Sequence, residues 1–364
     1  MDIDGQEEVD WFEAPPPADP TVVAGIKEFY RGKSIIKVVG EVNETGDKLM
    51  DFDNKEMKLY KCTYKLGPIE APRLIKKGNP VLDYEFISSF RHPAAVQVEN
   101  YFKKQCLVIS MVDGTFAKWL ARKEKEHLFT EQGRMLPLLR DMMINLASLV
   151  ETLIANGKVP TELTLKNVYI RILPDGTPKL QVLVNEVTKS TVDLKAGAWK
   201  AARDIFDYCF TSHGVGQDDV TKSFCSFFGT PLKNIQRLLE DFPDQWDNSR
   251  KFTFLMESCA HVGEVRYQIN FNSSGFAWPL TSQLLDHLIY HSEEKASPYI
   301  RTFPYDYVRL GRNGFKHFDD LPPWLKAQLG GNRDGLLSQI EQWTPNIWAK
   351  LYVAINSPPQ KKRR

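Results

Sequence analysis

The most informative stretch of this chain is YVRLGRNGFKHFDDLP, at residues 307–322. It carries a guanidinium, an amide and an imidazole at Arg312, Asn313 and His317, and a phenol, Tyr299, lies thirteen residues before the arginine. An imidazole with its ordinary pKa of ~6.5 transfers protons at neutral pH. A guanidinium holds a phosphate with two parallel N–H groups. These four side chains are therefore our candidate catalytic residues.

Composition and charge set the broad class of the protein. The 364 residues are enough for two domains, and contents of 42% hydrophobic and 12% aromatic residues are typical of globular domains with packed cores. The formal net charge of +1 provides no strong bulk field that would attract nucleic acid or membranes, although a local basic surface is compatible with it. No apolar run approaches ~18 residues, so we expect no membrane span.

The cysteines and the two chain ends indicate an intracellular protein. The N-terminus is acidic without a secretory segment, and we expect a cytoplasmic location, with the nucleus as an alternative. Residues 1–24 are acidic and then proline-rich, which predicts a disordered leader. Residues 357–364 form a basic tail, either a solvated end or a contact for RNA or for nuclear import. We interpret the scattered cysteines, which lack metal-ligand spacing, as buried thiols: Cys62, Cys106, Cys209, Cys225 and Cys259.

Hydrophobic periodicity in the first half predicts strands followed by a long helix. Residues 135–155 carry apolar side chains at helical spacing, and Asn156-Gly157 is typical of a helix end. A short helix is expected at 84–90, before His92-Pro93. The expected strands are 58–64, 74–75, 107–111, 168–173 and 179–184.

The pattern after about residue 235 is helical, with expected helices at 234–240, 251–259, 281–291 and 336–343. The predicted fold class is therefore α+β. It comprises a mixed strand-and-helix lobe, a helical lobe with one hairpin, and an all-helical extension.

Three motifs in the first two lobes resemble those of a protein kinase. FISSFRHP at 86–93 is similar to the end of the kinase helix C and the His-Pro after it, and RDIFDYC at 203–209 is similar to the start of helix F. RLIK at 73–76 stands where kinases carry Val-Ala-Ile-Lys, so the resemblance makes Lys76 the phosphate-pairing lysine and Glu85 its partner. It implies a two-lobed kinase-like domain over residues 25–235.

The catalytic parts of a kinase are degenerate in this chain. The stretch PTELTLKN at 160–167 aligns with His-Arg-Asp-Leu-x-x-x-Asn, which places Glu162 at the base position and retains Asn167. Val182 falls at the magnesium-binding aspartate, and a valine cannot ligate Mg²⁺. We therefore expect no protein kinase activity, whereas Lys76, Glu85 and Asn167 still allow ADP or ATP to bind in the cleft without transfer.

The last part of the chain resembles the kinase-extension-nuclease (KEN) domain, which follows a kinase fold in RNase L and in the unfolded-protein-response kinase/endoribonuclease. FPDQWD at 242–247 and RKFTFL at 250–255 look like the entry to that domain. The stretch at 307–322 is similar to its central motif, an Arg-Asn pair followed by two histidines, an aromatic residue and Leu-Pro. The resemblance covers about residues 25–356 and implies a KEN ribonuclease domain over 236–356.

By this resemblance the protein cleaves RNA without a cofactor. RNA supplies its own nucleophile, the ribose 2′-hydroxyl, so the reaction excludes DNA and yields a cyclic phosphate. His317 is implied as the acid and Tyr299 as the base or its orienter, with Asn313 adding a hydrogen bond. Arg312 would hold the phosphate and lower the pKa of the Tyr299 phenol.

Two residues depart from the family pattern. Lys316 replaces the first histidine of the pair and keeps a positive charge, which makes it a candidate RNA contact. Gly314 replaces the usual lysine and is expected to remove a cation from the RNA-facing surface. We expect both changes to alter RNA affinity.

The resemblance also implies partners. Nucleases of this family act when their kinase lobes pair, so we expect a homodimer, or a heterodimer with a related KEN protein. The main alternative is a catalytically silent protein that regulates an active relative. An active kinase is the third possibility, and Val182 argues against it.

Overall fold

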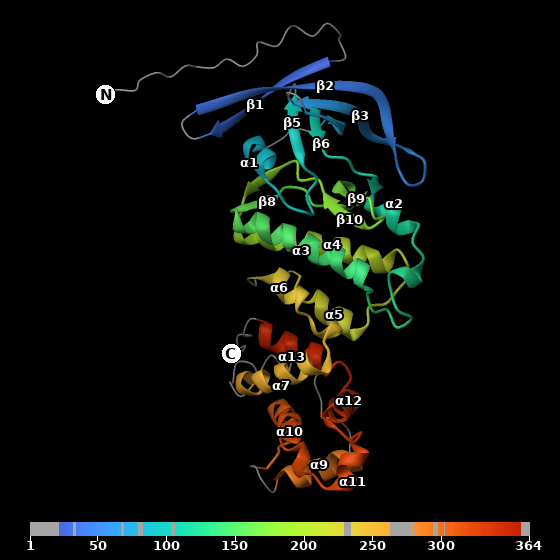
Figure 1. Ribbon diagram of the computed structural model, residues 1–364, viewed down its shortest axis with the longest axis vertical. Helices are drawn as coiled ribbons and strands as arrows, with labels where there is room; N and C mark the ends of the chain where they lie inside the picture. Colours follow the sequence, from blue (N-terminus) through green and yellow to red (C-terminus); the bar gives the residue numbers. More distant parts are fainter. Residues whose placement is uncertain are drawn as a thin grey trace, which may run out of the picture. The chain divides into compact units, whose positions relative to one another are not determined.

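The chain has a mixed α+β fold in which an N-terminal β-sheet region is followed by helices (Figure 1). The computed structural model describes residues 22–31, 34–66, 69–78, 83–102, 106–228, 234–262, 278–279, 282–293, 298–301 and 303–357. Most of the expected leader, residues 1–21, and the tail residues 358–364 lie outside the described residues. No helix within the described ranges is long and apolar enough to cross a membrane.

The chain divides into two compact units. Unit 1 runs to Leu128 and resumes at Leu136–Gly214, and unit 2 comprises Phe129–Met135 and Val215–Arg364. The domain boundary expected at residue 235 thus falls within unit 2. Helix α5 (Asp219–Cys225) precedes that boundary but packs on α13 (Ile347–Asn356), because its aromatic residues belong to the core of unit 2.

The first half of unit 1 is a six-stranded antiparallel sheet in the order β1-β2-β3-β4-β6-β5. Helix α1 (Tyr84–Ser89) lies between β4 and β5 in the chain, which confirms the short helix predicted before His92-Pro93. The strands predicted at 58–64 and 74–75 are also confirmed, and the strand predicted at 107–111 is confirmed in part, because β6 ends at Ile109. The strand bounds are β1 (Val22–Arg31), β2 (Ser34–Met50), β3 (Glu56–Leu66), β4 (Ile69–Lys77), β5 (Val98–Phe102) and β6 (Cys106–Ile109).

Strand alternation separates the two faces of this sheet. Successive side chains of a strand point to opposite faces, so Arg73 and Ile75 lie on one face of β4 while Leu74 and Lys76 lie on the other. On the first face Ile75 packs with Cys62, Tyr64 and Val108 in a buried cluster.

The second half of unit 1 is built around α3 (Pro137–Ala155) and α4 (Val192–Thr211), which pack against each other (Figure 1). Helix α3 begins with a proline at its first turn and ends at Ala155, shortly before Gly157, whose φ of +70° is readily adopted only by glycine. The predicted helix and its end are confirmed. The shorter elements are β7 (Gly114–Thr115), α2 (Phe116–Ala121), β8 (Lys158–Pro160), β9 (Val168–Ile172), β10 (Pro178–Val182) and β11 (Val187–Lys189).

Apart from the isolated bridge between Phe129 and Met135, the regular elements described in unit 2 are helices. An aromatic cluster joins its segments: Phe242 meets Phe224 edge-to-face at 5.4 Å and Tyr352 at 5.7 Å. The four helices predicted after residue 235 are confirmed as α6, α7, α9 and α12. The bounds are α6 (Ile235–Glu240), α7 (Asn248–Val262), α9 (Gln283–Glu293), α10 (Pro304–Lys316), α11 (Pro323–Gln328), α12 (Arg333–Trp343) and α13.

Candidate functional site

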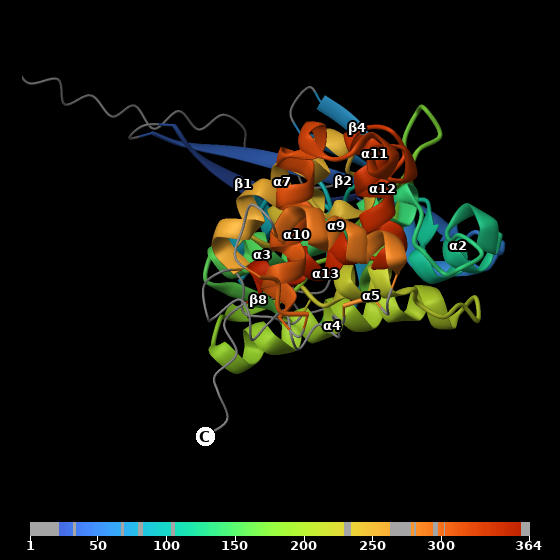
Figure 2. The ribbon, with the colours of Figure 1, turned by 90° about the horizontal axis from the view of Figure 1, so that it is seen from below.

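Helix α10 carries most of the candidate catalytic residues and has two distinct faces. It contacts α7, α9 and α12, and Figures 1 and 2 show it beside α9. Its buried face includes Tyr307, Leu310 and Gly311. A Cβ at Gly311 would lie 3.2 Å from Ile340 of α12, so glycine permits the close approach of the two helices. The opposite face carries cations and the site residues.

One turn of α10 holds the segment Pro298–Arg301 in place. The carboxylate of Asp306 accepts a hydrogen bond from the Ile300 amide at 2.6 Å and pairs with Arg309 at 3.3 Å. Arg309 also donates to the Pro298 carbonyl at 2.8 Å, and its guanidinium lies 4.5 Å from the centre of the Tyr299 ring. These contacts place Tyr299 against the helix.

A chain of hydrogen bonds joins three of the four predicted catalytic residues. Arg312 Nη1 donates to Asn313 Oδ1 at 3.2 Å, and Asn313 Nδ2 donates to the Tyr299 hydroxyl at 2.9 Å. The guanidinium can only donate, so it fixes which end of the Asn313 amide faces the phenol. Tyr299 is 8% exposed, whereas Arg312 and Asn313 are half-buried. The bonded set thus has a buried end and a more accessible end.

The environment of Tyr299 favours its protonated form. Burial raises the pKa of the phenol above its usual value near 10, and this effect exceeds the opposing effects of the Asn313 hydrogen bond and the Arg309 charge. The cation that acts on the phenol is Arg309 rather than Arg312, the residue expected from the sequence. Tyr299 is therefore suited to orient a partner by hydrogen bonding and poorly suited to accept a proton.

His317 follows the last turn of α10 and is exposed. Its backbone N–H donates to the Asn313 carbonyl at 2.9 Å, which sets it one turn beyond the bonded set. The Nδ1 atom lies 3.3 Å from Asp320 Oδ2. An imidazole whose Nδ1 is held by a carboxylate presents Nε2 for proton transfer.

The two departures from the expected pattern lie on different sides of α10. Lys316 is exposed, as a residue that contacts a ligand must be. Gly314 is buried, and a Cβ there would lie 3.4 Å from both Leu288 and Leu336. Position 314 belongs to the packed face, so the expectation that this glycine removes a cation from an exposed surface is wrong.

The donor types around α10 are those of acid–base chemistry and anion binding. Within the described residues there is no group of three His, Cys, Asp or Glu side chains placed to hold a metal ion. The accessible groups are the guanidinium of Arg312, the ammonium of Lys316 and the imidazole of His317. Together they can hold an anionic ester and exchange a proton with its leaving group.

The predicted nucleotide-site residues lie in unit 1. Burial lowers the pKa of Lys76, and the nearby charge of Glu162 partly opposes this effect. Glu85 is exposed on α1, and it forms no ion pair with Lys76. The carboxylate that acts on Lys76 is thus Glu162 instead of the expected Glu85.

Asn167 and Val182 lie next to each other at the ends of paired strands. Asn167 is buried and donates to the Glu162 carbonyl at 3.4 Å, while its own carbonyl accepts from Leu183 at 2.8 Å. Val182 is 1% exposed, and its backbone bonds Ala94 and Val96. These residues support the local backbone, and the Val182 side chain offers no oxygen ligand.

Arg309 is the site residue that the sequence reasoning missed. It contacts Tyr299 and anchors the segment that carries it, as described above. A signal was present, because Tyr305, Arg309, Arg312 and Lys316 follow helical spacing and share one face of α10. This helical spacing identifies Arg309 as a neighbour of Arg312 on the same helix face.

No protein-family model matches this chain, and no curated protein matches it.

Proposed function

We propose that this protein is an endoribonuclease that cleaves RNA by transesterification, with its active site on α10 and a kinase-like region that promotes dimerisation. No metal or cofactor takes part in the proposed step. The bonded set Arg312–Asn313–Tyr299, with His317 one turn further, carries this proposal.

The proposed reaction uses the 2′-hydroxyl of RNA as its nucleophile. Its oxygen attacks the adjacent phosphorus, its proton leaves to solvent, and the bond from phosphorus to the 5′ oxygen breaks. Protonated His317 gives its Nε2 proton to that leaving oxygen, and Asp320 stabilises the imidazolium. Arg312 and Lys316 balance the charge that develops on the phosphate oxygens. The products are a 2′,3′-cyclic phosphate and a free 5′-hydroxyl.

Tyr299 has an orienting role in this proposal. Its raised pKa keeps the phenol protonated at neutral pH. The Asn313 amide is held between this phenol and Arg312, so the guanidinium keeps one orientation. Preorganised donors stabilise a transition state without a cost of reorganisation.

The order of elements in unit 1 supports the kinase-like part of the proposal. Strands β2, β3, β4, β6 and β5 follow one another across the sheet, and α1 is inserted after β4. The kinase resemblance implies a helix C after the strand that carries Lys76, and α1 follows β4 in this order. Val182 provides no magnesium ligand, so we propose that unit 1 transfers no phosphate. ADP or ATP bound in the cleft would contact Lys76, and position 182 would hold no catalytic metal beside it.

One observation favours the alternative of a silent regulatory protein. Ile300 and Phe303 are 53% and 47% exposed; Ile300 lies within the segment that Asp306 and Arg309 anchor, and Phe303 follows that segment. Exposed apolar residues at this place suit a protein–protein contact. A heterodimer with an active relative could use this surface without any cleavage by this chain.

A cleavage assay in EDTA tests the proposal. The full chain is incubated at rising concentration with a stem-loop RNA, and the products are examined for a cyclic phosphate and a 5′-hydroxyl. We expect concentration-dependent cleavage that His317→Ala abolishes. Sedimentation with and without ADP reports the dimer in the same samples. Absence of cleavage from a sample that sedimentation shows to be dimeric would favour the silent protein.

His127→Ala is the matched control for this assay. His127 is also exposed and also faces a carboxylate three residues away along the chain, Glu124, at 3.6 Å. The variant removes the same kind of side chain from unit 1, so it should cleave RNA at the wild-type rate. An equal loss in both variants would show that the effect of His317→Ala is not specific to the site.

A further inference from the structure

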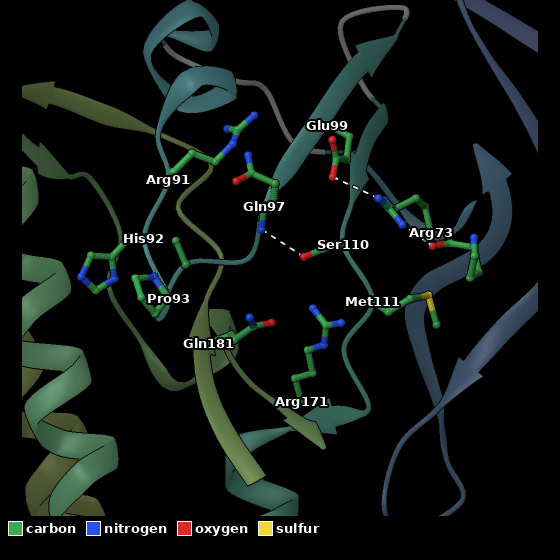
Figure 3. A pocket seen from close by; sticks show the side chains of 12 residues that line it. Arg73, Arg91, His92, Pro93, Gln97, Glu99, Ser110, Met111, Arg171 and Gln181 are labelled. Carbon is green, nitrogen blue, oxygen red and sulfur yellow. Dashed lines mark hydrogen bonds and ion pairs between the residues drawn. The ribbon is translucent and has the colours of Figure 1, made fainter. Parts of the chain in front are cut away.

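A cavity of about 600 Å³ lies in unit 1, and none of the candidate catalytic or nucleotide-site residues lines it. Its lining comes from β4, β5, β9, β10 and the segments that follow α1 and β6 (Figure 3). Arg73 lines it, and strand alternation puts Arg73 on the face of β4 opposite to Lys76. The lining side chains Arg73 and Gln181 thus lie on the strand faces opposite to Lys76 and Val182, respectively.

The lining of this cavity has an excess of positive charge. The lining carries three guanidinium groups, of Arg73, Arg91 and Arg171, and one carboxylate, that of Glu99, which pairs with Arg73 at 3.4 Å. Burial lowers the pKa of His92, and its Nδ1 accepts the Ala94 amide at 3.1 Å, so this imidazole is neutral. Two guanidinium charges thus remain without a carboxylate in the lining.

Arg171 is the cation that is free to bind. It is exposed, and within the described part of the chain its guanidinium has no hydrogen bond or ion pair. Arg91 uses Nη1 to donate to the carbonyls of Ser88 and Phe90, which fixes its position and leaves its other N–H groups available. In Figure 3 the Arg171 guanidinium, the Gln181 amide and the Ser110 hydroxyl point into the same hollow.

Gln181 provides an independent indication that this cavity binds a ligand. The residue is 8% exposed, yet its Oε1 atom is buried and accepts no hydrogen bond. A buried acceptor without a donor destabilises a fold, so native proteins nearly always give it one. Ser110 provides a donor beside this acceptor: its oxygen accepts from the backbone N–H of Gln97 at 3.0 Å, and its hydroxyl proton can be donated.

We propose that this cavity binds a small organic phosphate that carries a hydroxyl group. Arg171 and Arg91 hold the phosphate oxygens, and Ser110 donates a further hydrogen bond. The hydroxyl of the ligand donates to Gln181 Oε1. A guanidinium suits a phosphate because its planar fork matches two phosphate oxygens. The cavity is large enough for a phosphate with several carbon atoms.

Calorimetric titration of the full chain tests this site with three probes: glycerol 3-phosphate, inorganic phosphate and glycerol. We expect glycerol 3-phosphate to bind best and glycerol not to bind. Arg171→Gln should weaken glycerol 3-phosphate at least about tenfold, because a charge-assisted hydrogen bond contributes about 1.5–3 kcal/mol. Gln181→Met should weaken glycerol 3-phosphate towards the level of inorganic phosphate and leave inorganic phosphate unchanged.

Lys179→Gln is the matched control. Lys179 lies opposite Arg171 in the register of β9 and β10 and is exposed, but it does not line the cavity. Its removal should change the affinity less than about twofold. Equal losses in the Lys179 and Arg171 variants would overturn the proposal, since they would reflect bulk charge. So would the absence of saturable binding by glycerol 3-phosphate at millimolar concentration. Thermal unfolding without ligand identifies a variant that fails to fold, and Arg171→Lys then replaces Arg171→Gln.

Discussion

The amide of Asn313 donates a 2.9 Å hydrogen bond to the hydroxyl of Tyr299, and this bond joins helix α10 to the segment before it. The two residues are remote enough in the chain that nothing local determines their contact. Arg312 orients the amide, and Arg309 anchors the backbone beside Tyr299. The proposed active site therefore depends on groups that hold one another in place.

Removal of the Tyr299 hydroxyl should impair the site and leave the fold intact. Tyr299→Phe keeps the buried ring and loses one hydrogen bond, so we expect a loss of about 1 kcal/mol in unfolding free energy. RNA cleavage should fall by about tenfold or more, because Asn313 and Arg312 lose their fixed orientation. Urea unfolding and initial cleavage rates measure the two effects. Tyr290→Phe, at an exposed tyrosine of α9, should change neither quantity, and an unaltered rate in Tyr299→Phe would remove Tyr299 from the site.

Arg309 should matter for stability as well as for cleavage. Arg309→Met leaves the buried Asp306 carboxylate without its cation, and we expect a loss of about 2–4 kcal/mol in unfolding free energy. The pKa of Tyr299 should rise further, since Arg309 lowers it in the native protein.

Arg301→Met provides the control for that substitution. Arg301 pairs with Asp286, but both side chains are nearly half-exposed, so the loss should stay below about 1 kcal/mol. Chemical unfolding of the two variants under the same conditions compares them. A smaller effect at Arg309 than at Arg301 would contradict the anchoring role.

A lysine at position 314 should not restore a missing cation. Gly314→Lys forces a long side chain between Leu288 and Leu336, so we expect it to destabilise the protein by about 1–3 kcal/mol. RNA affinity should not increase. Gly197→Lys in α4, where no atom lies within 4 Å of the added Cβ, should be neutral or stabilising by up to about 1 kcal/mol. A Gly314→Lys protein of full stability that binds RNA more tightly would contradict the packed position of this residue.

Alkaline pH should destabilise the protein through its buried tyrosines. Burial raises the pKa of Tyr307 to about 12 from its usual value near 10. The unfolded chain therefore loses this proton first, and the stability present below pH ~10 declines as the pH rises towards 12. Each such group contributes a slope of at most about 1.4 kcal/mol per pH unit. Urea midpoints between about pH 9 and pH 11 should fall less steeply in Tyr307→Phe, whereas Tyr290→Phe should keep the wild-type slope.

Much of the fold follows from local patterns. The apolar spacing of α3 and its Gly157 end predict that helix without any tertiary information, because a helix face and a left-handed cap are properties of neighbouring residues. The boundary between the units is different. Phe224 and Phe227 lie before residue 235 but pack with Phe242 and Tyr352, and periodicity contains nothing about such long-range partners.

For the candidate site, the sequence by itself determined which chemical groups are present and their order along the chain, although helix α10 was not among the predicted helices. Only the tertiary structure decided what surrounds them. It buried Tyr299 and so raised its pKa, it gave the phenol Arg309 as its cation, and it turned Gly314 towards Leu288. The physical reason is that pKa values and packing depend on distances in space, and a chain folds residues remote in sequence into the same few ångströms.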